Sequence, residues 1–228
     1  MAYLKINDIN VYYEINGQGE PVVLINGLAS TVAENRWLID QLAEKYRVLT
    51  FDNRGTGQTD KPDIPYSIEM MASDAAGLMQ ELHFDPAAVI GVSMGGRIAL
   101  ALTINSPELV KKLVLVSTSA RVIRSGRKQF ILKALHRLQF LTDDQPVYAF
   151  KRQLEASSRF DATAHLPDIH VPALILHGKT DHVASYTLAQ EMSRGIAGSK
   201  MITFNGGHLF FMMGERTRFL TAVTEFLN

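Results

Sequence analysis

The sequence contains no cysteine, carries no net charge and has no long hydrophobic run. Without cysteine, the chain can form neither disulfides nor thiolate metal sites, and a cysteine nucleophile is excluded. Its 23 basic and 23 acidic residues cancel, so no net electric field attracts nucleic acid, anionic lipid or a highly charged substrate. Since no apolar run approaches the ~18 residues of a membrane-spanning helix, we expect a chain that does not cross a membrane.

The first eleven residues are typical of a strand rather than of a targeting segment. Residues 1–11 alternate apolar residues with lysine, asparagine and aspartate, whereas a signal peptide needs a continuous apolar stretch. We therefore expect a soluble, cytoplasmic protein whose partner is a small molecule near neutral charge. Nucleic-acid binding and stable membrane association are not expected, and the sequence leaves open whether the chain is a monomer or a small homo-oligomer.

The length and composition suit one α/β domain with a large core, because the chain has 228 residues and is 46% hydrophobic. Six short apolar runs predict buried strands: Val22–Ile25, Val48–Phe51, Ala88–Ile90, Leu113–Val116, Ala173–Leu176 and Met201–Phe204. Amphipathic stretches between most of them predict helices: Ala33–Ala43, Ile68–Leu82, Gly95–Asn105, Leu188–Arg194 and Phe210–Leu227. A hairpin is expected at the start, where Leu4–Ile6 and Val11–Ile15 flank a turn at 7–10. The alternation predicts a mostly parallel sheet of about eight strands with helices on both faces.

One segment departs from this alternation. Residues 119–166 contain no strand candidate but two helical stretches, Ile123–Leu141 and Pro146–Ser157. The first stretch has apolar residues at helical spacing, so it has an apolar side that must cover something, and a lid over a cleft would fit. We therefore predict a core formed by 1–118 and 167–228, interrupted by a helical lid insertion.

The motif Gly91-Val92-Ser93-Met94-Gly95 has the spacing Gly-x-Ser-x-Gly, which arises by chance in roughly one chain of this length in ten. Its context makes it more specific, because the strand candidate Ala87–Ile90 precedes it and a good helix former, Gly96–Leu102, follows it. Such a turn exposes the serine oxygen beside a helix N-terminus, which stabilises negative charge. The alternative is a plain glycine-rich connection between strand and helix.

A nucleophilic serine needs a base and an acid, and both have candidates later in the chain. Asp181 follows the strand candidate Ala173–Leu176, and His208 follows Met201–Phe204. Loops at the carboxyl ends of strands are where α/β sheets build their sites. Asp181 could instead be a helix cap or turn residue, and His208 a hydrogen-bonded loop histidine.

The oxyanion formed during attack on a carbonyl needs two N–H donors. The backbone of Met94 is one candidate, and the backbone of Leu28 is the other, in the loop Asn26-Gly27-Leu28-Ala29-Ser30. The alternative for that loop is a simple glycine turn.

Together these motifs resemble the α/β-hydrolase superfamily, and in particular small bacterial esterases and lactonases with a lid after the sixth strand. The resemblance includes the chain order Ser93, Asp181, His208 and the loop 52–59, which is similar to the family's Asp-x-Arg-Gly-x-Gly-x-Ser loop. It implies the α/β-hydrolase fold with a short helical lid and a structural role for that loop, in which we expect Asp52 and Arg54 to form an ion pair. The chain departs from the family in having Asn26-Gly27 where His-Gly is usual.

The resemblance implies a carboxylic ester hydrolase that uses Ser93 as nucleophile, His208 as base and Asp181 as the acid that orients it. Relatives that cleave haloalkanes or epoxides carry aspartate at the nucleophile position, so those activities are disfavoured. A thioesterase, a C–C hydrolase, a cofactor-free perhydrolase and a ligand receptor that retains the three residues stay open. The sequence has neither a phosphate-binding nor a dinucleotide-binding fingerprint and no zinc-binding spacing, so we expect no cofactor and no metal.

Overall fold

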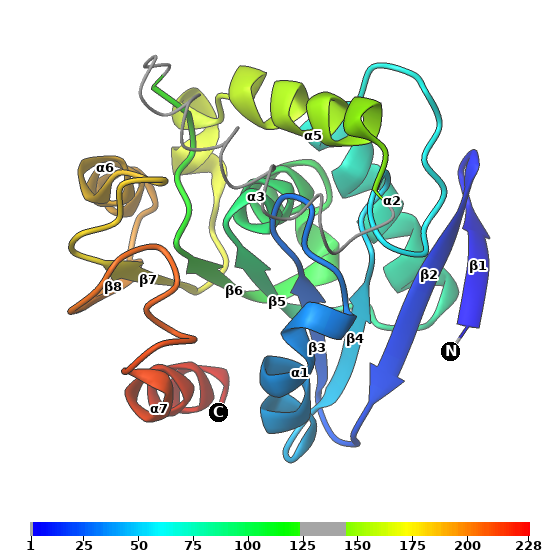
Figure 1. Cartoon of the computed structure of the whole chain (residues 1–228). Helices are drawn as coiled ribbons and strands as arrows, with labels where there is room; N and C mark the ends of the chain where they lie inside the picture. The colour runs from blue at the N-terminus through cyan, green and yellow to red at the C-terminus, as the bar shows by residue number, and fades with distance from the viewer. Residues whose placement is uncertain (1, 124–144) are drawn as a thin grey trace.

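The structure, a computed structural model, describes residues 2–123 and 145–228. Eight strands form one sheet in the order β1-β2-β4-β3-β5-β6-β7-β8 (Figure 1). They are β1 (Ala2–Ile6), β2 (Ile9–Asn16), β3 (Pro21–Ile25), β4 (Arg47–Phe51), β5 (Ala87–Val92), β6 (Val110–Val116), β7 (Ala173–Gly178) and β8 (Lys200–Phe204). β2 runs antiparallel to both of its neighbours, β1 and β4, and the other strand pairs of the sheet are parallel. The predicted mostly parallel sheet of eight strands is confirmed.

Helices cover both faces of the sheet (Figure 1). The described helices are α1 (Arg36–Ala43), α2 (Ile68–Glu81), α3 (Met94–Asn105), α5 (Val147–Arg159), α6 (Tyr186–Gly195) and α7 (Arg216–Leu227). Side chains of α2, α3 and α6 pack into one buried cluster, and those of α1 and α7 pack into another. Because β3 and β5 lie between these clusters, their runs of buried residues follow directly from burial on both faces.

Three predicted boundaries differ from the structure. The turn of the first hairpin is two residues long instead of four, because Asn7 adopts a positive φ of 52° that reverses the chain early. The first helix begins with a 3-10 turn at Ala33–Asn35. The last helix begins at Arg216 rather than at Phe210, since Phe210 turns into the core and Gly214 has a φ of 92°.

The predicted lid falls partly outside the described residues. Most of the helical stretch Ile123–Leu141 lies within 124–144, while the second stretch forms α5. Figure 1 shows α5 beyond the carboxyl ends of the central strands. The division into a core and an insertion at 119–166 stays a prediction. Within the described residues, no helix is long and apolar enough to cross a membrane.

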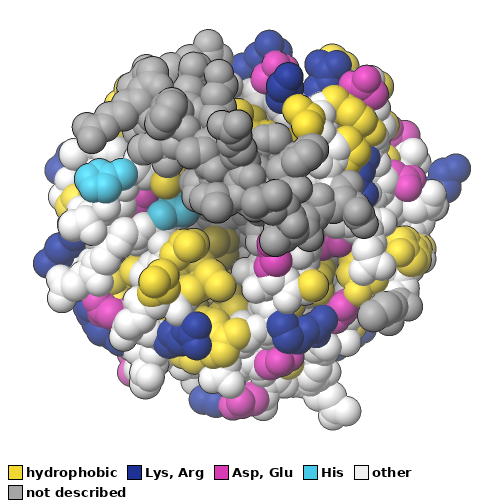
Figure 2. Space-filling view, in the orientation of Figure 1, with side chains coloured by type: hydrophobic (Ala, Val, Ile, Leu, Met, Phe, Trp, Pro, Cys, Tyr) yellow, Lys and Arg dark blue, Asp and Glu magenta, His cyan; other side chains and the backbone are white. Residues whose placement is uncertain are grey.

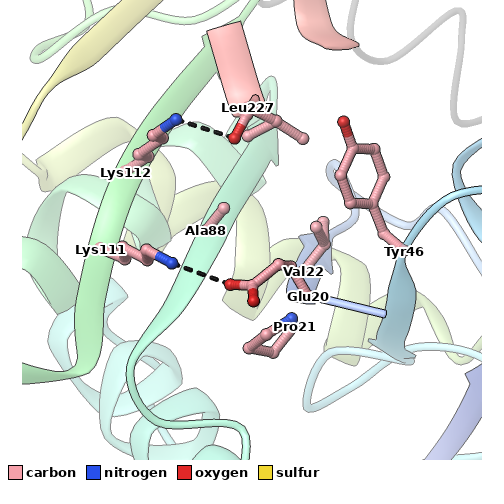
Figure 3. A pocket seen from close by; sticks show the side chains of 8 residues that line it. All are labelled: Glu20, Pro21, Val22, Tyr46, Ala88, Lys111, Lys112 and Leu227. Carbon is pink, nitrogen blue, oxygen red and sulfur yellow. Dashed lines mark hydrogen bonds and ion pairs between the residues drawn. The ribbon is translucent and has the colours of Figure 1, made fainter. Parts of the chain in front are cut away.

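A small surface hollow lies at the opposite, amino edge of the sheet (Figure 3). It is lined by the starts of β3, β5 and β6 and by the chain end, through Glu20, Pro21, Val22, Tyr46, Ala88, Lys111, Lys112 and Leu227. Both lysines already have partners, because Lys111 binds the Glu20 carboxylate and Lys112 binds the Leu227 carbonyl, each at 2.8 Å. The residues singled out in the sequence follow the carboxyl ends of strands, so this hollow is not part of their site.

Candidate active site

Ser93 sits on a sharp turn between β5 and α3. Its φ of 55° is costly for a residue with a side chain, by about 1–3 kcal/mol, so the surroundings must hold it. The Ser93 N–H donates to the Val116 carbonyl at 2.9 Å, and the Thr118 hydroxyl donates to the Ser93 carbonyl at 2.7 Å. Gly95 is needed where α3 passes β3, because a Cβ there would lie 2.1 Å from the Ile25 carbonyl oxygen.

A chain of hydrogen bonds joins the three residues expected from the sequence. Ser93 Oγ lies 2.9 Å from His208 Nε2, and His208 Nδ1 lies 2.8 Å from Asp181 Oδ2. A carboxylate accepts the Nδ1 proton, which leaves Nε2 free to accept the serine proton. The His208 loop is tied down by Ser117, whose hydroxyl donates to the His208 carbonyl at 2.7 Å. The structure therefore brings together residues that lie far apart in the sequence.

Asp181 is buried and oriented from behind. Its second oxygen, Oδ1, accepts the backbone N–H groups of Val183 and Ala184 at 2.8 and 2.9 Å. These two bonds close a short turn after β7, so one carboxylate oxygen serves the loop and the other serves His208. Asp181 is thus a turn residue through Oδ1, and its Oδ2 lies within hydrogen-bond distance of His208.

Two histidines lie close to Asp181 in the sequence, His177 and His182. His177 is buried beside the Asp181 carboxylate, whereas His182 is exposed. His177 Nε2 lies 2.9 Å from the Ala184 carbonyl and 3.5 Å from Asp181 Oδ2. Burial lowers the pKa of His177, while the Ala184 carbonyl and the Asp181 carboxylate act in the opposite direction. A neutral imidazole that donates from Nε2 fits these contacts, with Nδ1 lacking a partner among the described residues.

The loop after β3 passes directly beside the serine. A Cβ on Gly27 would lie 3.4 Å from the Ser93 Cβ. Asn26, which stands where relatives carry histidine, is buried and donates to the Phe51 carbonyl at 3.2 Å. Within the described part of the chain, no acceptor takes the backbone N–H of Leu28 or of Met94. Both N–H groups are therefore available to a ligand.

Gln153 is a residue that sequence reasoning missed. It projects from α5, is fully buried, and accepts the Ala29 N–H at 3.2 Å. Its Nε2 donates to the Arg54 carbonyl at 2.7 Å and to the Thr56 hydroxyl at 2.6 Å. One side chain thus joins α5, the loop after β3 and the loop after β4. The sequence signal was only a glutamine on the apolar side of a helix.

The expected ion pair between Asp52 and Arg54 is wrong. Asp52 accepts the backbone N–H groups of Val32 and Gln58 at 2.7 and 2.8 Å. Arg54 instead binds Asp74 of α2 at 2.7 Å and also Asp8 at the hairpin turn. The Asp52 carboxylate is thus held by one N–H group of its own loop and one of the segment after β3, and burial raises the pKa of Asp52. Arg54 therefore links the loop after β4 to α2 and to the turn between β1 and β2.

Hydrophobic side chains follow His208 in the sequence. Phe210 and Phe211 are buried, whereas Leu209 and Met213 are exposed. Figure 2 shows hydrophobic side chains gathered near two histidines on the viewed face. No group of three or more potential metal-ligating side chains occurs among residues 2–123 and 145–228. The described site therefore consists of hydroxyl, imidazole, carboxylate and backbone groups beside an apolar surface.

Comparison with curated proteins places most of the chain in one family. A family model described as alpha/beta hydrolase fold matches residues 20–169. YisY of Bacillus subtilis, an AB hydrolase superfamily protein, is 30% identical, and the match covers 99% of this chain and 98% of YisY. BpoC of Mycobacterium tuberculosis is 42% identical over 130 residues, covering 55% of this chain and 48% of BpoC. The chain thus spans about half the length of BpoC in that match.

A solved structure agrees with these sequence matches. An esterase from Exiguobacterium antarcticum, EaEST, superposes with a TM-score of 0.88 at 28% sequence identity. The superposition covers 99% of this chain and 98% of EaEST. The similarity therefore extends over the whole core and not only over the serine motif.

Proposed function

Because this chain belongs to the alpha/beta hydrolase fold family, we propose that it is a serine hydrolase that cleaves a small carboxylic ester or lactone. The observation that carries the proposal is the continuous hydrogen-bonded chain from Ser93 Oγ through His208 to Asp181. The backbone N–H groups of Leu28 and Met94, which have no acceptor among the described residues, support it, since the reaction needs donors for a developing oxyanion. The similarity to the esterase EaEST supports an ester as substrate.

In the first half of the proposed reaction, Ser93 Oγ attacks the carbonyl carbon and transfers its proton to His208 Nε2. The carbonyl oxygen becomes an oxyanion, which the N–H groups of Leu28 and Met94 stabilise together with the N-terminus of α3. Asp181 holds the His208 ring and stabilises the imidazolium that forms. When the tetrahedral intermediate collapses, His208 returns the proton to the leaving alkoxide, and the acyl group stays on Ser93.

In the second half, water replaces the alcohol. His208 Nε2 accepts a proton as water attacks the acyl carbon, and the same two N–H groups stabilise the second oxyanion. Collapse releases the carboxylic acid and restores the Ser93 hydroxyl with the proton from His208. For a lactone, the leaving alkoxide remains tethered to the acyl group, so one hydroxy acid is released.

Hydrolysis of short p-nitrophenyl esters tests this proposal. We expect Ser93→Ala and His208→Gln to lower kcat by several orders of magnitude, because each removes a member of a unit that acts together. Ser158→Ala, a hydroxyl removal on α5, is the matched control and should keep wild-type rates. The proposal is refuted if Ser93→Ala turns over esters at the wild-type rate.

The same experiment distinguishes an enzyme from a receptor that keeps these residues. A fluorophosphonate should label Ser93 in either case, so it reports only that the nucleophile is active. Many turnovers per chain on any ester, lactone or thioester support the hydrolase. A single turnover that leaves a retained acyl adduct on Ser93 supports the receptor instead.

A further inference from the structure

Arg97 is a buried cation within one helical turn of the candidate nucleophile. It lies in the first turn of α3 and is only 8% exposed. Its guanidinium donates to the Ser157 hydroxyl at 2.7 Å and to the Ser119 hydroxyl at 3.2 Å. Its Nε–H has no partner among the described residues. The cation is therefore held by two neutral hydroxyls, and its Nε–H is left unused.

This environment is unfavourable for an arginine on three grounds. No carboxylate of the described residues lies within ion-pair distance of Arg97, although burial of a charge normally requires one. The N-terminal end of a helix carries partial positive charge, which repels a cation. Burial lowers the pKa of Arg97 to about 10, and only the more distant Asp181 carboxylate raises it. At neutral pH the group still carries its charge.

The second buried arginine of the fold shows what a structural cation looks like. The side chain of Arg54 is 1% exposed and is paired with the carboxylates of Asp74 and Asp8. Arg97 has no such pair within residues 2–123 and 145–228. The contrast indicates that Arg97 is arranged for an anion that does not come from the described chain.

The three segments around Arg97 also carry or hold residues of the candidate active site. Ser93 begins the helix on which Arg97 lies. Ser119 follows β6 two residues after Ser117, whose hydroxyl holds the His208 carbonyl. Ser157 lies one turn beyond Gln153 on α5, and Gln153 holds the loop that contains Leu28. A substrate group that binds Arg97 would thus lie beside the reacting ester.

We propose that Arg97 is a specificity residue that binds a carboxylate on the substrate, so that the preferred substrates are half-esters of dicarboxylic acids or lactones that carry a carboxylate. The inference rests on the proposed function. The unused Nε–H and an adjacent guanidinium N–H form the fork that matches the two oxygens of a carboxylate. One local cation suffices for this recognition, which is compatible with the absence of net charge.

The ratio of kcat/KM for anionic and neutral substrates tests this proposal. Monomethyl succinate, glutarate and adipate are compared with their dimethyl esters. We expect the wild type to prefer at least one half-ester, and Arg97→Met to lower that preference by at least about 30-fold, as for a lost charge-assisted hydrogen bond. Arg97→Lys keeps the charge but loses the fork, so its preference for the half-ester should lie between those of the wild type and Arg97→Met. Arg152→Met is the matched control, since Arg152 of α5 is paired with Asp63 at 3.3 Å and should keep the wild-type ratio.

A binding measurement separates this inference from the hydrolase proposal. In Ser93→Ala, the preferred half-ester should raise Tm, and the added change Arg97→Met should abolish that shift. If no ester is hydrolysed but this Arg97-dependent shift is seen, the hydrolase proposal fails and the carboxylate site stands. If esters are hydrolysed but the wild type shows no preference for any half-ester, the inference is overturned and the hydrolase proposal stands. A lower Tm for Arg97→Met with an unchanged substrate ratio also overturns it, because that is the behaviour of a structural residue.

Discussion

The buried Gln153 links α5 to the loop that carries the candidate oxyanion donor Leu28. Replacing Gln153 therefore tests whether that loop contributes to the proposed reaction, without changing a proposed catalytic residue. Gln153→Leu keeps the approximate size of the side chain but removes its four hydrogen bonds, one of which its Oε1 accepts from Gln145 Nε2 at 3.3 Å. The Ala29 N–H, the Arg54 carbonyl and the Thr56 hydroxyl each lose a partner at 3.2, 2.7 and 2.6 Å. All three groups lie where water is excluded by the packing of α5.

The magnitude follows from these losses and is smaller than three full ones, because the Thr56 hydroxyl keeps Gln145 Nε2 as a partner at 3.4 Å. A buried polar group left without a partner costs about 1–3 kcal/mol, and the leucine regains part of this by burying apolar surface. We expect the free energy of unfolding to fall by about 2–5 kcal/mol. Because Ala29 adjoins Leu28, we also expect kcat to fall by about tenfold, which is less than the 10²–10³ lost when an oxyanion donor is removed outright.

Urea denaturation and ester hydrolysis provide the two measurements, with Glu155→Leu on the exposed side of α5 as the control. A second variant, Gln153→Glu, keeps the acceptor for the Ala29 N–H but directs a carboxylate at the Arg54 carbonyl. Its destabilisation relative to wild type should shrink as the pH falls, because a protonated glutamate regains a donor. The reasoning is refuted if Gln153→Leu unfolds at the same urea concentration as Glu155→Leu and keeps the wild-type kcat.

Two further changes probe the serine turn and the support of the acid. Gly95→Ala should destabilise the fold by at least about 2 kcal/mol and abolish ester hydrolysis, because the new Cβ would lie 2.1 Å from the Ile25 carbonyl oxygen; wild-type urea stability of this variant would contradict the close approach. Burial holds the pKa of His177 below its unfolded value of about 6.5. As the pH falls below that value, the unfolded chain binds a proton at His177 before the folded chain does, so stability is lost. His177→Gln should remove this contribution, of at most about 1.4 kcal/mol per pH unit, from urea curves measured between pH 7 and 5; parallel pH profiles for variant and wild type would argue against it.

Much of the fold was predictable because the strands are local patterns. Each central strand is buried on both faces, so its residues are continuously apolar and can be recognised without knowing its neighbours. Ser93 and Asp181 follow two such strands, β5 and β7, and His208 follows the edge strand β8. Since the carboxyl ends of parallel strands meet at one edge of a sheet, the sequence also predicted that these three residues lie close together, as they do.

The boundaries were less predictable where packing competes with helical spacing. The apolar residues from Phe210 onward suggested a helix, yet Phe210 stacks against Phe204 at a ring distance of 4.3 Å. That contact belongs to the end of β8 and turns the backbone into the core before the helix begins. A periodic pattern records which residues are buried, but not which element buries them.

The sequence by itself determined the sheet, the serine turn and the meeting of Ser93, Asp181 and His208, because each depends on a short pattern and on the rule that the carboxyl ends of parallel strands share an edge. Only the tertiary structure decided the partners of the long polar side chains. Arg54 binds Asp74 rather than the nearby Asp52, Gln153 reaches across from α5, and Arg97 is left without a carboxylate within the described chain. Such side chains reach several ångströms from the backbone, so their partners are selected by the distances between packed elements, which no local pattern contains.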